Sequence, residues 1–131
     1  MKTYYVRDTT DMGRGVFADR DFKAGELICY CELLVFSATD KELFEETDLK
    51  YYTFRFNDTQ DCLVLGDGEL FNHSDRENVS YELVTIPDAI KPRTLMKFTT
   101  TRPILQDEQM FINYSADIQV DTKQYTINMV G

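Results

Sequence analysis

The stretch "GELFNHSDREN", residues 68–78, contains the only histidine of this 131-residue chain. His73 lies between Asn72 and Ser74, just after a glycine turn and just before a charged run. A histidine suggests acid–base chemistry because its side chain titrates near neutral pH. A half-buried structural histidine near a turn is the alternative, and the residues of this stretch alone leave the choice open.

The bulk composition predicts one compact domain in the cytoplasm or nucleus. Hydrophobic residues make up 43% of the chain and charged residues 28%, as in ordinary globular proteins. No apolar run approaches the roughly 20 residues that cross a bilayer. The first residues, "MKTYYVR", lack the apolar segment of a signal peptide.

The charge balance predicts a basic polypeptide partner. The chain has 14 basic and 23 acidic residues, which gives a net charge of −9. An acidic surface repels phosphate, so we expect no direct binding of nucleic acid. It attracts basic protein segments instead. Solubility alone is the simpler explanation of the same charge.

The cysteines predict neither a disulfide framework nor a metal site. Their number is odd, and Cys29 and Cys31 lie in an apolar run, where buried thiols behave as small hydrophobic groups. A hydrolase that pairs His73 with Cys62 or Cys29 is an unfavoured alternative, because no stretch supplies a recognisable setting for a nucleophile.

Short strand-like runs, several of them with the two-residue period of a strand, dominate the chain and predict a mostly-β domain. They cover residues 4–7, 15–18, 26–36, 51–56, 61–65, 79–83, 94–100 and 109–114. The spacing of Thr39 and Glu42 is that of a capping box, which predicts a short helix over about 40–46.

Three segments stand in a specific order: "MGRGVFADRDFKAGELI" (12–28), "GDGELFNHSDREN" (66–78) and "RPILQDEQMFINY" (102–114). Together they resemble the SET-domain family of protein lysine methyltransferases, most closely its small stand-alone viral and bacterial members. The matching residues are Gly13-Arg14-Gly15-Val16-Phe17, Gly25-Glu26-Leu27-Ile28, Asn72-His73-Ser74 with Asn78, and Ile104 through Tyr114. The resemblance covers about residues 10–118 of a single domain over 1–131, and leaves 119–131 as a tail.

The resemblance implies a fold and an activity. The fold is the β-clip of short strands, with a knot-like crossing near the C-terminus. The activity is transfer of a methyl group from S-adenosylmethionine to a lysine amine of a protein. The amine must be neutral to attack, and its ordinary pKa of about 10.4 opposes this in water. An apolar channel lowers that pKa, and no metal is needed.

The resemblance also implies roles for individual residues. Tyr114 is the expected catalytic residue, although a core tyrosine is the alternative. Contacts with the cofactor are expected from Gly13, Arg14, Gly15, Asn72 and His73, so the resemblance implies a third role for the stretch around His73, a backbone cradle for a cofactor. A lysine channel lined by Tyr52, Phe54 and Tyr125 is a weaker expectation, because a plain core stripe explains the first two about as well. The expected substrate is a basic protein, histone-like or ribosomal.

Several positions depart from the family pattern. Asp75 and Glu77 stand where many relatives have cysteine and proline, and Asp107 replaces a turn glycine. Ile118 stands where short relatives often have an aromatic residue. These departures leave open a silent SET-fold module that binds cofactor or peptide without turnover. Small relatives can dimerise, so a homodimer that closes the channel also stays open, and a viral origin would place the protein in a host compartment.

Overall fold

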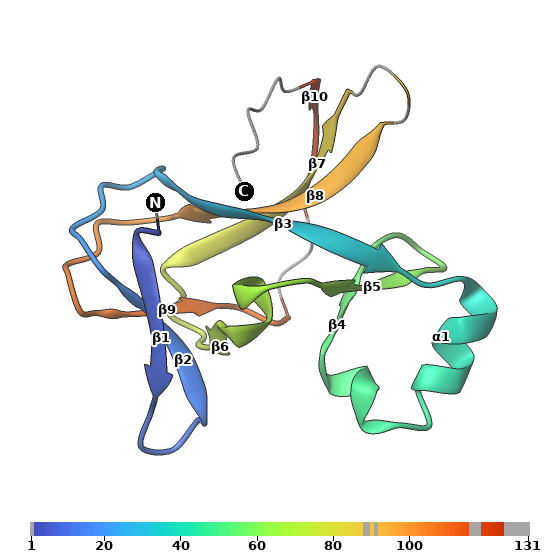
Figure 1. The fold of residues 1–131 in the computed structure, drawn as a ribbon, viewed down its shortest axis with the longest axis horizontal. Coiled ribbons are helices and arrows are strands. Elements are labelled where there is room, and N and C mark those ends of the chain that lie inside the picture. Colours follow the sequence, from blue (N-terminus) through green and yellow to red (C-terminus); the bar gives the residue numbers. More distant parts are fainter. Residues whose placement is uncertain (1, 88–89, 91, 116–118, 125–131) are drawn as a thin grey trace.

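Two β-sheets form most of the molecule, for which a computed structural model describes residues 2–87, 90, 92–115 and 119–124 (Figure 1). The four-stranded sheet has the order β1 (Tyr4–Asp8), β2 (Arg14–Ala18), β9 (Gln109–Ile112), β6 (Asn72–His73). The six-stranded sheet has the order β10 (Gln119–Gln124), β7 (Val79–Ile86), β8 (Arg93–Thr100), β3 (Leu27–Val35), β5 (Asp61–Val64), β4 (Thr53–Arg55). The mostly-β prediction is confirmed.

Helical segments are few and short. They are α1 (Ala38–Phe44) and two 3-10 turns, η1 (Asp48–Tyr51) and η2 (Asp67–Leu70). Within the described ranges, no helix has the length and apolar character that crossing a membrane requires.

The core lies between the two sheets and follows from the alternation of side chains along the strands. Val79, Tyr81 and Leu83 of β7 face inward, and so do Met96 and Phe98 of the neighbouring strand β8. Such alternation places every second side chain of a strand on the buried face. The same core receives Met110 and Ile112 from β9 and so joins the two sheets.

The predicted crossing near the C-terminus is a parallel pairing of β6 with β9. Asn72 is opposite Phe111 and His73 is opposite Ile112. The buried Asn78 continues the contact: its amide donates to Gln109 O at 3.0 Å and its Oδ1 accepts from Phe111 N at 2.7 Å. Two segments distant in the sequence are thereby held side by side as neighbouring strands of the four-stranded sheet.

A lobe of residues 37–58, the α1–η1 lobe, projects from the end of the molecule opposite β1 and β2 (Figure 1). The N-cap residue of helix α1 differs from the one that the sequence pattern predicted. Ser37, not Thr39, accepts the N–H of Asp40 (3.1 Å), so α1 covers 38–44 rather than 40–46.

The strand predicted over 51–56 was also too long. Tyr51 ends the 3-10 turn η1, and only 53–55 pair with β5. Asn57 ends the strand, because its Oδ1 accepts from the N–H groups of Thr59 and Gln60 and turns the chain back.

Candidate functional site

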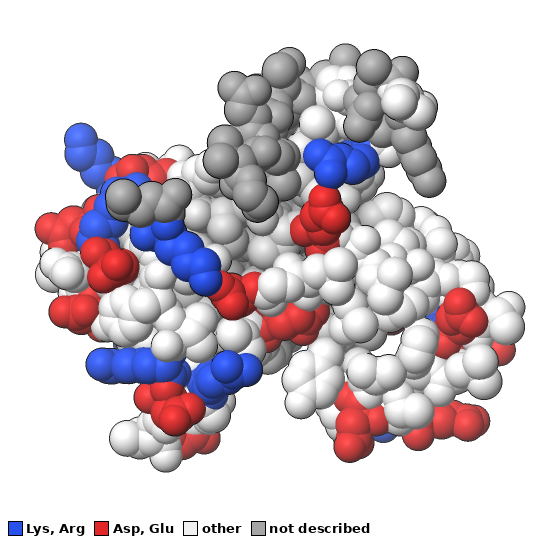
Figure 2. Space-filling view, in the orientation of Figure 1, with Lys and Arg blue, Asp and Glu red and all other residues white. Residues whose placement is uncertain are grey.

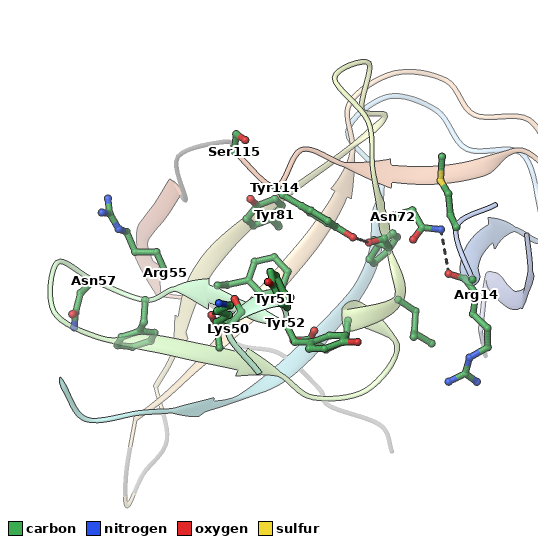
Figure 3. Close-up of a pocket in the computed structure, with 18 of the residues that line it drawn as sticks. Arg14, Lys50, Tyr51, Tyr52, Arg55, Asn57, Asn72, Tyr81, Tyr114 and Ser115 are labelled. Carbon is green, nitrogen blue, oxygen red and sulfur yellow. Dashed lines mark hydrogen bonds between the residues drawn. The ribbon is translucent and has the colours of Figure 1, made fainter. Parts of the chain in front are cut away.

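An open cleft of about 1170 Å³ lies between the β6–β9 crossing and the α1–η1 lobe (Figure 3). Residues 12–14, 50–58, 69–72, Tyr81 and 114–115 line it. Its volume exceeds the roughly 300–1,000 Å³ of pockets for one small molecule, so it has room for two ligands.

Tyr114 lies in the middle of the cleft, and three contacts fix its position. Its hydroxyl donates to Phe71 O at 2.7 Å, and its own N–H donates to His73 Nδ1 at 2.9 Å. Its ring packs against the imidazole at 5.1 Å between centroids. The residue is 55% exposed, yet burial of the phenol end raises its pKa, and the nearby Glu69 raises it further.

The contacts of His73 fix its tautomer and its role. The N–H of Tyr114 can only donate, so Nδ1 must be the unprotonated, accepting nitrogen. The proton of a neutral ring is then on Nε2, which lies 3.2 Å from Asp75 Oδ1. The ring therefore holds the backbone of Tyr114 beside the cleft and does not itself line the cleft.

Asn72 connects the segment Gly13-Arg14-Gly15, the glycine segment, to the β6–β9 crossing. Its Nδ2 donates to Arg14 O (3.1 Å), as Figure 3 shows, and to Gln109 Oε1 (3.0 Å). Both amide hydrogens are thus engaged, and its Oδ1 has no hydrogen-bond partner within the part of the chain that the structure describes.

Gly15 makes this junction sterically feasible. A Cβ built on it would lie 2.6 Å from Gln109 Oε1 and 3.0 Å from Asn72 Nδ2, so a side chain at this position would displace the Gln109 amide from Asn72. Gly15 itself is buried behind the cleft, whereas Gly13 and Arg14 line it.

The aromatic residues predicted for a lysine channel separate into two settings. Phe54 lines the cleft and also packs edge-on against Tyr81, with ring centroids 5.4 Å apart. Tyr52 lies at the rim and is 56% exposed, so it is no part of a core stripe. Tyr125 and Ile118 lie outside the described residues.

Sequence reasoning missed several residues of the cleft, and Glu69 is the most notable. Its carboxylate is half-buried and accepts the N–H of Val64 at 2.8 Å. Burial raises its pKa to about 7. The signal was present in the motif itself, because a charged residue stands between the core positions Gly68 and Leu70.

None of the three cysteines lines the cleft. Cys62 is fully buried, and burial raises the pKa of its thiol to about 12. Both nitrogens of His73 have other contacts, so the geometry does not favour the hydrolase alternative. Across the described ranges, no group of His, Cys, Asp or Glu is arranged to hold a metal ion.

Two departures from the family pattern preserve its geometry. Asp107 adopts the left-handed conformation (φ 71°) of the glycine that it replaces, which aspartate tolerates better than most residues. The loop with Asp75 and Glu77 still delivers Asn78 to its buried position on β9.

The fold and the cleft define a SET-type methyltransferase scaffold, and comparisons with known proteins agree. The model of the SET domain family matches residues 13–115, so the chain belongs to the SET-domain family. It is 31% identical, over 83% of its own length and 71% of the relative's, to the H3 lysine-37-specific histone-lysine N-methyltransferase of Schizosaccharomyces pombe. Together the family and this relative support protein lysine methylation as the class of activity.

Solved structures show the same fold. A candidate histone methyltransferase of Plasmodium falciparum superposes with a TM-score of 0.70 at 24% identity, over 89% of this chain and 96% of that one. The CpSET8 protein of Cryptosporidium gives a TM-score of 0.66 at 21% identity, over 88% of this chain and 59% of that one.

Proposed function

We propose that this protein transfers a methyl group from S-adenosylmethionine to the ε-amine of a lysine in a basic, histone-like protein. One observation carries the proposal. The glycine segment with Asn72 and the aromatic residues around Tyr114 share one cleft, although they come from distant parts of the chain. A methyl transfer between two substrates needs such a junction, because the donor and the acceptor must meet in line.

The residues at the Arg14–Asn72 end of the cleft suit the cofactor. S-adenosylmethionine carries an ammonium and a carboxylate at one end and supplies the electrophilic methyl group. Asn72 Oδ1 is available to accept from that ammonium, because the amide nitrogen is already engaged by Arg14 O and Gln109. The open main chain at Gly13 and the guanidinium of Arg14 suit the carboxylate.

The other side of the cleft suits a lysine side chain. Phe54, Phe71 and Tyr81 present apolar surface, which disfavours an ammonium and so favours the neutral amine. Tyr114 is held by His73 and Phe71 O and so presents its phenol at the junction. The expected effect of Tyr114 is to orient the amine toward the methyl group.

Charge on the surface supports a basic substrate. Acidic side chains lie along the outer edge of the α1–η1 lobe (Figure 2), next to the cleft. The exposed acidic residues there are Asp40, Glu42, Glu45, Glu46 and Asp48. Basic segments such as histone tails would be attracted to this edge. The substrate in the name of the Schizosaccharomyces pombe relative, histone H3, is the first one to try.

Substituting Tyr114 by Phe tests the proposal. We expect labelled methyl to pass from S-adenosylmethionine to lysine in core histones, and the rate to fall about 100-fold in Tyr114→Phe, because misplacing a reacting group costs about that factor. Cofactor affinity, measured by calorimetry, should stay unchanged, because the phenol lies on the lysine side. Absence of both methyl transfer and cofactor binding would refute the proposal.

The same experiment also tests the alternative, a SET-fold module that binds cofactor or peptide without turnover. It would bind S-adenosylmethionine but label none of a panel of histones, ribosomal proteins and basic peptides. The retained turn at Asp107 and the retained position of Asn78 favour the enzyme.

A further inference from the structure

Glu69 presents a carboxylate to the cleft beside the proposed lysine site. It lies on η2, two residues before the Phe71 carbonyl that accepts the hydroxyl of Tyr114. Glu69, Phe71 and Tyr114 all line the cleft. The charge of Glu69 is close enough to the phenol of Tyr114 to raise its pKa.

One carboxylate oxygen of Glu69 accepts a hydrogen bond from the backbone, and the other is available to a ligand. Oε1 accepts the N–H of Val64 at 2.8 Å. Oε2 has no hydrogen-bond partner, and no Lys or Arg forms an ion pair with Glu69, within the residues that the structure describes. Half-buried carboxylates without a cation are unusual, because burial penalises an unpaired charge.

The backbone just before Glu69 is packed tightly against the core. A Cβ on Gly68 would lie 2.6 Å from Val64 Cγ1 and 2.8 Å from Phe98 Cε2, so η2 is packed directly onto the core. The direction in which Glu69 leaves the core is therefore fixed by residues of β5 and β8.

Most of the charged groups on η2 and on the elements packed against it have partners of their own. The elements packed on η2 are β2, β3 and β5. Asp67 of η2 itself binds Lys2 and Tyr4, Glu32 of β3 binds Arg93, and Asp61 of β5 binds Lys41. The remaining groups of β3 and β5 are the thiols of Cys29, Cys31 and Cys62 and the phenol of Tyr30. The phenol of Tyr114 and the exposed cation Arg14 of β2 line the same cleft as Glu69, and no ion pair joins Arg14 to Glu69 among the described residues.

We propose that Glu69 receives the substrate lysine: its carboxylate pairs with the incoming ammonium and then takes one proton from it. The step balances as carboxylate plus ammonium giving carboxylic acid plus neutral amine. The lone pair that this frees on the amine is the one that attacks the methyl group. The proton leaves to solvent through the open cleft after transfer. This inference rests on the proposed lysine methyl transfer.

The proton affinity of the group suits this task. Burial raises the pKa of Glu69 to about 7, so the carboxylate is ionised above neutral pH and still basic enough to accept a proton. Asp58, the other acidic residue that lines the cleft, is exposed rather than half-buried.

The pH dependence of kcat/KM with core histones tests the proposal, using Glu69→Gln, which keeps an oxygen for Val64 N. In the wild type we expect kcat/KM to rise up to about pH 7 and then to level off. In Glu69→Gln it should fall about 100-fold at pH 7.5, the lower end of general acid–base effects, and keep rising toward pH 10 as free lysine deprotonates. Glu69→Asp should restore part of the inflection. Asp67→Asn, which removes the other carboxylate of η2 outside the cleft, should keep the wild-type profile.

An independent readout is the carboxyl resonance of ¹³C-labelled Glu69, assigned by its loss in Glu69→Gln. Adding Nα-acetyl-lysine amide should lower the pKa of this carboxyl, because a nearby ammonium favours the carboxylate. Nα-acetyl-norleucine amide, which lacks the amine, should leave it unchanged.

The outcomes separate the two proposals. If the pH profile of kcat/KM kept its wild-type shape in Glu69→Gln, whatever the absolute rate, the role of Glu69 would be overturned while methyl transfer would stand. The role of Glu69 would also be overturned if Nα-acetyl-lysine amide left the pKa of the Glu69 carboxyl unchanged. This outcome does not depend on whether any histone is labelled. Loss of cofactor binding in the wild type would instead remove the methyltransferase proposal.

Discussion

Individual residues of the cleft are held in place by hydrogen bonds to other residues of the same site. His73 accepts the N–H of Tyr114, Phe71 O accepts its hydroxyl, and Asn72 joins Arg14 to Gln109. Burial raises the pKa of three residues that line the cleft, Tyr81, Tyr114 and Glu69. The consequences for stability differ, because among these three only Glu69 changes charge near neutral pH.

We expect Glu69 to make stability depend on pH in a direction opposite to most carboxylates. Its folded pKa of about 7 lies above the ordinary 4.5, so the folded state holds the proton more tightly. The associated stability is present below about pH 4.5 and is lost as pH rises through 7. Urea midpoints of wild type and Glu69→Gln, compared from pH 4.5 to 8.5, should therefore shift in favour of the variant as pH increases. A difference independent of pH would contradict this expectation.

At the scale of elements, a buried side chain reinforces the backbone pairing of β6 with β9. Asn78 bridges Gln109 O and Phe111 N and is 2% exposed. Replacing it by alanine would leave a buried carbonyl and a buried N–H without partners, which costs about 1–3 kcal/mol. We expect Asn78→Ala to lower the free energy of unfolding in urea by about that amount, while Ser80→Ala, at an exposed site on β7, should change it little.

The helix of the α1–η1 lobe gives a second prediction, about its cap. Ser37 accepts Asp40 N, so Ser37→Ala should destabilise α1 by about 1 kcal/mol. Thr39→Ala should be neutral or slightly stabilising, because Thr39 lies inside the helix, where alanine is favoured. Thermal unfolding of the two variants distinguishes them, and equal losses would contradict the assignment of the cap.

These two elements also show how far the sequence could predict the fold. The ordered motifs identified the β6–β9 crossing, because Asn72-His73-Ser74, Asn78 and the segment to Tyr114 are needed together to build it. The cap of α1 was mistaken because Ser37 and Thr39 both carry a hydroxyl, and only the position of Asp40 N chooses between them.

The rest of the site depends on contacts that no local pattern contains. The alternation "YYTFRF" predicted a strand, but the Asn57 turn shortened it to 53–55 and left Tyr52 exposed at the rim. Glu69 was missed because its environment comes from Val64 and Phe98, which reach it through η2 packing. The residues proposed for cofactor and lysine remain predictions, to be tested by the experiments above.

At the scale of the whole molecule, the net charge of −9 sets how a basic partner approaches. Raising ionic strength from about 0.1 M to about 1 M shortens the screening length from roughly 10 Å to 3 Å. We therefore expect KM for core histones to rise several-fold with added NaCl. A variant with Glu45→Lys and Glu46→Lys, on the exposed edge of the lobe, should show higher KM at low salt and a weaker salt dependence.

The parallel pairing of β6 with β9 also has a consequence for synthesis of the protein on the ribosome. Asn72 and Phe111 are partners in that pairing, so a growing chain that has emerged only as far as residue 105 has the glycine segment but no strand to hold Asn72. Contacts between such distant residues form late and slowly. Met110 and Ile112 of β9 belong to the same core cluster as Phe71 and Phe98, so until β9 arrives this core is incomplete. This is the interval in which a chaperone would protect the nascent chain.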